Sequence, residues 1–116
     1  MLDAAGRRAE ALQRFEQALA IDTALGSTEG RAFDKRWIAT TLLGQKRLDE
    51  ARAAVDESLA LSREVGNSYN ELQALLLRGR IGEARGDATA LRDFEEAATK
   101  ARATALLEAH GLARRG

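Results

Sequence analysis

An apolar pattern occurs three times along this chain at a spacing of about forty residues. Each copy places small or apolar residues at positions i, i+4 and i+7, so that they share one face of a helix. The copies are Ala11, Phe15 and Ala18; Ala51, Val55 and Ser58; and Ala90, Phe94 and Ala97. A period of this length indicates stacked supersecondary units rather than one closed core.

Composition restricts the units to helices. The 116 residues include no proline and only 4% aromatic residues, and they are rich in Ala, Leu, Glu and Arg. This usage favours helix over nearly the whole length and predicts an all-α fold of about five helices in a single domain, residues 1–116.

Charge and cysteine content limit the possible partners. The 18 basic and 18 acidic residues cancel, so the overall field attracts neither nucleic acid nor an anionic membrane surface. The chain has no cysteine, no apolar run long enough to span a bilayer and no signal-like start. We expect a soluble cytoplasmic protein.

Glycine, serine and asparagine residues mark the helix ends. The pattern predicts a turn at Gly6, N-caps at Ser27 or Thr28, and a stop and cap at residues 66–68. The predicted helices cover residues 7–25, 28–43, 48–65, 68–85 and about 87–110, followed by a tail at residues 111–116. Gly79, Gly82 and Gly86, at i, i+3 and i+7, favour close approach of another helix over a ligand role.

The second unit, GRAFDKRWIATTLLGQKRLDEARAAVDESLALSREVGN, resembles the tetratricopeptide repeat in its longer bacterial form of about forty residues. The segments GRRAEALQRFEQALAID and RGDATALRDFEEA resemble parts of further units. The chain departs from the pattern at Thr23, where proline is common, at Val55 and Ser58, which replace an aromatic residue and an alanine, and at Arg78, which replaces an apolar residue. The resemblance implies antiparallel helix pairs stacked in a right-handed superhelix, with units at residues 1–26 (incomplete), 27–66 and 67–110.

The resemblance also implies a concave wall formed by the first helix of each pair. It would bind a peptide or helix of a partner protein, as in bacterial signalling or transcription-regulatory proteins. The positions that map to this wall are Phe33, Arg36, Trp37 and Thr40 in the second unit and Gln73, Leu76, Leu77 and Arg80 in the third. Aromatic and arginine side chains are common binding anchors. The sequence leaves open whether Phe33 and Trp37 instead pack against a neighbouring helix.

Structural self-association is the alternative function. The helix at residues 7–25 has only six residues before it, too few for a partner helix. We therefore expect the face of Leu12, Phe15 and Leu19 to be buried in a homodimer or against a neighbouring repeat.

Catalysis has little support in the sequence. His110 is the only histidine, and it has no cysteine or second histidine with which to bind a metal. Adjacent acidic pairs such as Glu95 and Glu96 diverge by about 100° on a helix, so they do not converge on one substrate atom. No phosphate-binding glycine motif is present. We expect neither enzymatic activity nor a cofactor or metal site.

Overall fold

The computed structural model describes residues 4–110, which form five helices joined by short turns. The helices are α1 (Ala4–Ala24), α2 (Thr28–Gly44), α3 (Leu48–Val65), α4 (Ser68–Arg85) and α5 (Ala90–Ala109). No strand occurs within the described residues, which confirms the all-α prediction. Among these helices none is long and apolar enough to cross a membrane.

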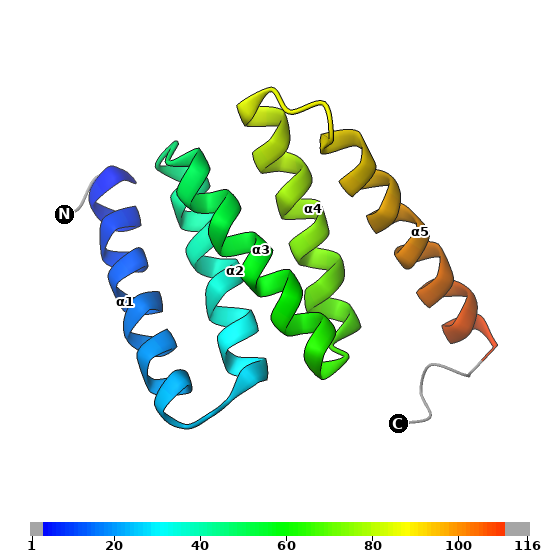
Figure 1. The fold of residues 1–116 in the computed structure, drawn as a ribbon, viewed down its shortest axis with the longest axis horizontal. Helices are drawn as coiled ribbons and strands as arrows, with labels where there is room; N and C mark the ends of the chain where they lie inside the picture. Colours follow the sequence, from blue (N-terminus) through cyan, green and yellow to red (C-terminus); the bar gives the residue numbers. More distant parts are fainter. Residues whose placement is uncertain (1–3, 111–116) are drawn as a thin grey trace.

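The helices are stacked as antiparallel neighbours in chain order (Figure 1). Each helix packs against the next one, and α2 also contacts α4, the only pair among the described helices that is not consecutive. Helices α2 and α4 therefore lie side by side, with α3 packed against both. This arrangement is that of a stack of helix pairs.

The forty-residue period is visible in the geometry of the turns. Gly26 and Gly66, which end the first and third helices, have φ of 70° and 69°, and Lys46 and Gly86, after the second and fourth, have 60° and 77°. The N-caps repeat in the same way: Ser27 Oγ accepts from the Gly30 N–H at 3.0 Å, and Asn67 Oδ1 accepts from the Asn70 N–H at 3.0 Å. Equivalent backbone positions thus recur at the same spacing as the apolar pattern.

Two predicted boundaries are wrong. Gly6 does not form a turn but lies inside α1, which begins at Ala4. Glycine is tolerated this close to a helix end because few backbone hydrogen bonds depend on it. The last helix begins at Ala90 rather than near Asp87, because Asp87 donates its N–H to the Gly82 carbonyl and so belongs to the end of α4. The predicted tail at residues 111–116 lies outside the described residues.

The core lies between α2, α3 and α4. Its central side chains are Ile38, Leu42, Val55, Leu59, Leu75, Leu77 and Ile81, with alanines between them. In contrast, no residue of α1 is fully buried, and residues 101–110 of α5 are all exposed. Each of the two terminal helices therefore contacts its neighbour with one face, and its other face is exposed.

The two glycines within α4 allow α5 to approach closely, as predicted. A Cβ atom on Gly79 would lie 2.6 Å from Cε1 of Phe94, and one on Gly82 would lie 3.1 Å from Cβ of Ala90. The absent side chain of Gly79 thus makes room for the Phe94 ring. Gly86 has a different role, because its positive φ belongs to the turn after α4.

A pair of carboxyl groups joins α1 to α2. Asp34 is only 4% exposed, and Gly30 leaves room for the carboxyl of Asp22 beside it, since a Cβ there would lie 2.6 Å from Asp22 Cγ. Burial, together with a hydrogen bond and charge repulsion from Asp22, raises the pKa of Asp34 to about 7. The folded protein therefore holds Asp34 protonated at mildly acidic pH.

We predict that Gly79→Ala destabilises the protein by about 1 kcal/mol. Alanine gains about 1 kcal/mol in helix propensity, but the overlap with the rigid Phe94 ring costs about 1–3 kcal/mol. Urea unfolding of the wild type, Gly79→Ala, Phe94→Leu and the double variant would measure the coupling. If Phe94→Leu changes the free energy of unfolding equally in the wild type and in Gly79→Ala, the proposed contact is contradicted.

The Asp34 pair predicts a loss of stability as pH rises. Between the ordinary pKa of 3.8 and the folded value of about 7, the folded state binds more protons than the unfolded chain, so stability falls across this range. Asp34→Asn, which stays neutral, should be more stable than the wild type at pH 8 and should have a flatter pH profile. Urea unfolding from pH 4 to pH 8 would measure this, with the exposed Glu64→Gln as control. A wild type and an Asp34→Asn variant with parallel profiles would exclude the raised pKa.

Candidate functional site

A small groove runs between α2 and α4, with a volume of about 110 Å³. We call it the α2/α4 groove, and it is lined by Arg36, Thr40, Leu43, Gln73, Leu76, Leu77 and Arg80. Of the residues predicted to bind a peptide, Arg36, Thr40, Gln73, Leu77 and Arg80 are brought together here. The contact between α2 and α4 is what aligns the two rows of side chains.

Two of the predicted site residues have a different environment from the one expected. Leu77 is only 6% exposed and belongs to the core, so it forms the floor of the groove rather than a free anchor. Phe33 is 50% exposed but does not line the groove. Phe33 lies one helical turn before Arg36, the first α2 residue that lines the groove, and its ring contacts the Arg36 guanidinium instead.

Aromatic side chains and an arginine form a cluster on α2. The guanidinium of Arg36 lies 5.6 Å from the centroid of the Phe33 ring and 5.2 Å from that of Trp37. Burial lowers the pKa of Arg36, and the interaction with Tyr69 opposes this effect. Cation–π contacts hold the charged group at the edge of the α2/α4 groove.

Trp37 packs against a neighbouring helix, which is one of the two alternatives that the sequence left open, and it does not line the α2/α4 groove. It is half-buried, and its ring stacks on Phe15 of α1 with centroids 5.9 Å apart and planes 16° from parallel. Its indole Nε1 is buried and has no hydrogen-bond partner. Ring packing rather than hydrogen bonding therefore fixes Trp37, and part of the ring remains open to solvent.

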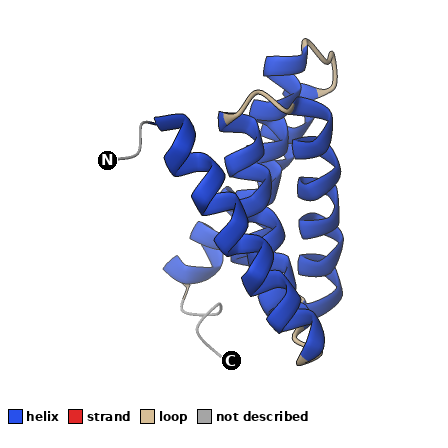
Figure 2. Ribbon diagram, turned by 90° about the vertical axis from the view of Figure 1, so that its left-hand side faces the viewer, coloured by secondary structure: helices blue, strands red, loops and turns tan. Residues whose placement is uncertain are grey.

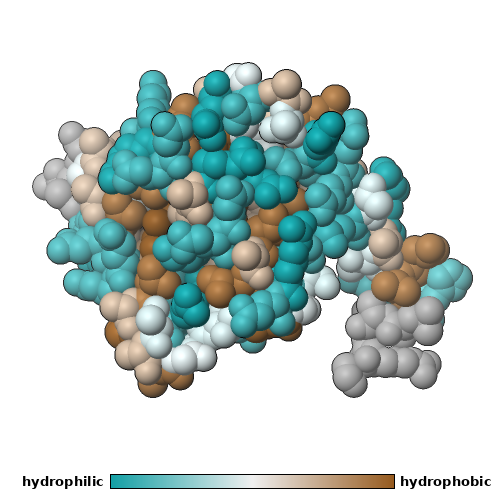
Figure 3. Space-filling model, in the orientation of Figure 1, coloured by the Kyte–Doolittle hydropathy of each residue, from teal (hydrophilic) through white to brown (hydrophobic). Residues whose placement is uncertain are grey.

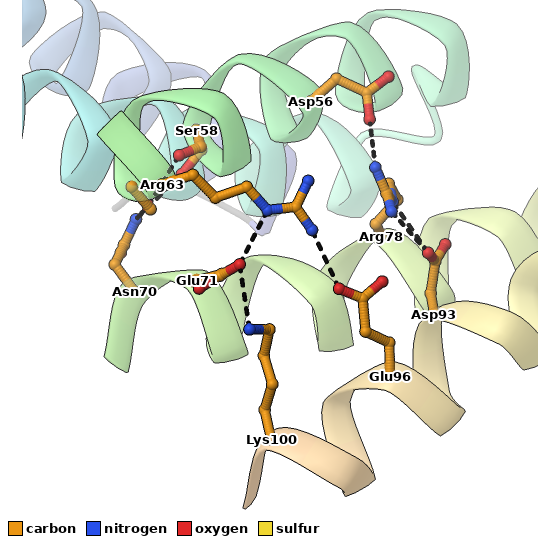
Figure 4. A network of polar contacts seen from close by, with 10 residues as sticks. Asp56, Ser58, Arg63, Asn70, Glu71, Arg78, Asp93, Glu96 and Lys100 are labelled. Carbon is orange, nitrogen blue, oxygen red and sulfur yellow. Dashed lines mark hydrogen bonds and ion pairs between the residues drawn. The ribbon is translucent and has the colours of Figure 1, made fainter. Parts of the chain in front are cut away.

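Asn70, which sequence reasoning missed, connects three helices (Figure 4). It is 2% exposed and lies at the start of α4. Its Nδ2 donates to Ser62 Oγ at 2.7 Å, to Ser58 Oγ at 3.1 Å and to the Ala32 carbonyl at 3.3 Å. Its Oδ1 accepts from Arg36 Nε at 2.6 Å. Asn70 thus fixes the position of the groove arginine relative to α3 and α4.

The sequence contained a signal for this network. Ser58 stands where alanine is usual in the repeat, and Ser62 follows one helical turn later on the same buried face. Ser58 Oγ also donates to the Ala32 carbonyl at 2.7 Å. Polar side chains at core positions need partners, and Asn70 provides them.

Ion pairs on α4 hold α3 and α5 against it (Figure 4). Arg78 donates to Asp93 of α5 at 2.8 Å and to Asp56 of α3 at 3.2 Å. Burial lowers the pKa of Arg78, but its hydrogen bonds to the two carboxylates outweigh this and raise it. Arg78, which stands where the resembled repeat pattern has an apolar residue, thus has a partner in the buried carboxylate of Asp93.

A second groove lies between α1 and α2 and has a volume of about 320 Å³. We call it the α1/α2 groove. Ala11 and Phe15 line it from α1, Trp37, Thr40 and Thr41 line it from α2, and Arg7 and Arg8 lie at one end. The hydroxyls of Thr40 and Thr41 donate to the carbonyls of Arg36 and Trp37, so they offer little polarity to a ligand.

The predicted self-association face is partly covered within the chain. Leu12, Phe15 and Leu19 are partly buried against the core, and their further burial in a homodimer or against a neighbouring repeat stays a prediction. The exposed large apolar residues of α1 are Ile21 and Leu25, at 61% and 75%. Helix α2 covers this face only in part, and Phe15 also lines the open α1/α2 groove.

Exposed apolar side chains occur at both ends of the stack as well as on the central helices, at Phe33, Val65 and Tyr69. On the face shown in Figure 3, apolar patches occur among hydrophilic side chains over the α1 and α2 half and at the free end of α5. The exposed leucines of α5 are Leu91, Leu106 and Leu107. His110 follows α5 as an exposed residue, and the described residues include no group of three or more His, Cys, Asp or Glu placed to hold a metal.

Comparisons with models of protein families, with curated proteins and with solved structures found no match. Function is therefore inferred from the geometry of the chain itself.

We predict that Asn70→Ala destabilises the protein by about 2–3 kcal/mol, because it leaves several buried polar groups with fewer partners. It should also free Arg36 from its position at the groove. Urea unfolding would measure the loss, with the exposed Glu83→Ala on the same helix as control. If Asn70→Ala unfolds at the same urea concentration as Glu83→Ala, the network does not connect the three helices energetically.

Proposed function

We propose that this chain is an interaction module of the tetratricopeptide-repeat type that binds an acidic peptide or helix of a partner protein along the α2/α4 groove. The proposal is supported by the forty-residue recurrence of helix pairs and by the shared face of α2 and α4. It requires no cofactor or metal.

The charge of the groove is the observation that carries the proposal. Two of its lining residues, Arg36 and Arg80, are basic, and none is acidic. Within residues 4–110 neither arginine has a carboxylate partner, whereas Arg63, Arg78 and Arg85 all form ion pairs with carboxylates. A peptide carboxylate would supply the missing counter-charge, and the apolar walls at Leu43 and Leu76 would accept a neighbouring apolar side chain.

Pre-organisation of Arg36 favours this function. Asn70 accepts a hydrogen bond from Arg36 Nε, and two aromatic rings flank the guanidinium. The remaining guanidinium N–H groups keep a fixed direction, so less side-chain entropy is lost when a carboxylate binds.

Self-association remains the second candidate. The exposure of Ile21 and Leu25 on α1 favours it, because a second copy could cover them. Light scattering across a range of micromolar concentrations would separate the two functions: a constant monomer mass would remove self-association.

Selection from a library of random peptides would test the groove. We predict that the selected peptides are enriched in Asp and Glu and that added salt weakens their binding. Arg80→Glu should reduce their affinity about tenfold, equivalent to about 1.4 kcal/mol. The matched control is Arg102→Glu, an exposed arginine on α5. Peptides without acidic enrichment, or equal binding by both variants, would refute the proposal.

A further inference from the structure

The α1/α2 groove has a covered counterpart in the same molecule. Forty residues after Ala11, Phe15, Trp37 and Thr41 come Ala51, Val55, Leu77 and Ile81. In this second set Ala51, Val55 and Ile81 are completely buried and Leu77 is 6% exposed. The first set is more open, since Ala11, Phe15 and Trp37 are only half-buried and line a groove.

The difference between the two sets has an evident cause. Ile38, Ala39 and Leu42 of α2 pack in one cluster with the second set, so α2 is the helix that covers it. The first set has no such cover within residues 4–110, and Figure 2 shows α1 in front, with no helix before it at this end of the stack. The α1/α2 groove is therefore the same kind of surface as one already buried by a helix.

We propose that the α1/α2 groove is a docking site for an amphipathic α-helix of a partner polypeptide, which packs there as α2 packs on α3 and α4. The helix would present apolar side chains at positions i, i+1 and i+4, the spacing of Ile38, Ala39 and Leu42. It would run antiparallel to α1, as α2 does to α3 (Figure 1). The groove is distinct from the α2/α4 groove, with which it shares only Thr40.

Charge at the end of the groove sets the direction and composition of this helix. Arg7 and Arg8 line the groove at the start of α1. In an antiparallel arrangement the C-terminal end of the docked helix lies beside them, and its carbonyl groups carry partial negative charge. Acidic residues in the last turn of the docked helix would strengthen the attraction.

A second copy of this chain is a poorer occupant. The helix that has the required apolar spacing, α2, is already packed against α1, α3 and α4. A separate polypeptide therefore fits the groove better.

The chain contains its own probe for this site. A peptide of residues 27–45, with Trp37→Phe in the peptide only, carries the α2 packing face. The full chain has one tryptophan, Trp37, which lines the groove, so its fluorescence reports on a single position at this site. We expect the peptide to shift the emission to shorter wavelength in a saturable manner and to reduce quenching by acrylamide. A control peptide with Ile38→Lys and Leu42→Lys should have no effect.

Two variants of the full chain locate the binding. Ala11→Arg fills the groove and should reduce the affinity for the peptide about tenfold or more. Circular dichroism verifies that the variant is folded. Arg8→Glu, at an exposed position, reverses the charge at the groove end and should weaken binding without altering the floor. Arg80→Glu should bind the peptide as the wild type does, which separates this site from the α2/α4 groove.

A tethered form of the probe covers the case of weak binding in trans. A copy of residues 27–47, again with Trp37→Phe in the copy, is joined directly ahead of Arg8. It should protect Trp37 from acrylamide and raise the urea midpoint relative to the same fusion with the two lysines. The proposal would be overturned if Trp37 stays equally accessible in this fusion, if Ala11→Arg and Arg8→Glu leave peptide binding unchanged, or if a dimer of the unmodified chain shields Trp37 by itself.

Discussion

The buried amide of Asn70 is the contact on which the arrangement of the central helices depends. Its side chain bonds to the backbone of α2, to two serines of α3 and to Arg36 of the groove. Its backbone N–H donates to Asn67, the N-cap residue of α4. An amide in an apolar interior is costly unless its hydrogen bonds are made, so only one register of the three helices is acceptable. Apolar packing alone would tolerate small shifts between helices, but this network does not.

Electrostatics has a similar role at the C-terminal side of the stack. Arg78 connects Asp56 of α3 with the buried Asp93 of α5, and the first turn of α5 is thereby held on α4. Gly79 complements this contact by admitting the Phe94 ring. Past this point α5 makes fewer contacts, and its last ten described residues are exposed. The ion pair therefore determines where α5 is attached, and apolar contact determines how closely.

The two grooves differ in what they offer a partner. The α2/α4 groove is narrow and has a charged rim with a buried leucine floor, which suits an extended acidic peptide. The α1/α2 groove is larger and more apolar, and its counterpart one repeat later is filled by a helix. Trp37 lies close to both, because its ring stacks on Phe15 on one side and carries the guanidinium of Arg36 on the other. Binding in either groove would thus change the surroundings of Trp37.

The sequence by itself determined the secondary structure and the repeat. The apolar spacing, the absence of proline and the glycine and cap residues predicted five helices, and two of the four boundaries at α3 and α4 involve residues named in advance as a stop and a cap, Gly66 and Asn67. These features are local: helix periodicity, capping and positive φ depend on residues within a few positions of each other. The row of residues on one face of α2 and α4 followed instead from the resemblance to the tetratricopeptide repeat.

Only the tertiary structure decided how exposed each of these residues is. Leu77 belongs to the core, Phe33 lies outside the α2/α4 groove and contacts Arg36, and Leu12, Phe15 and Leu19 are partly buried. Asn70 and Asp34 have functions that depend on residues of neighbouring helices, such as Ser58, Ser62 and Asp22, and helix periodicity does not identify such pairs. Periodicity gives the direction of a side chain from its own helix, but burial and pairing depend on the distance and rotation of the neighbouring helix, which long-range packing sets.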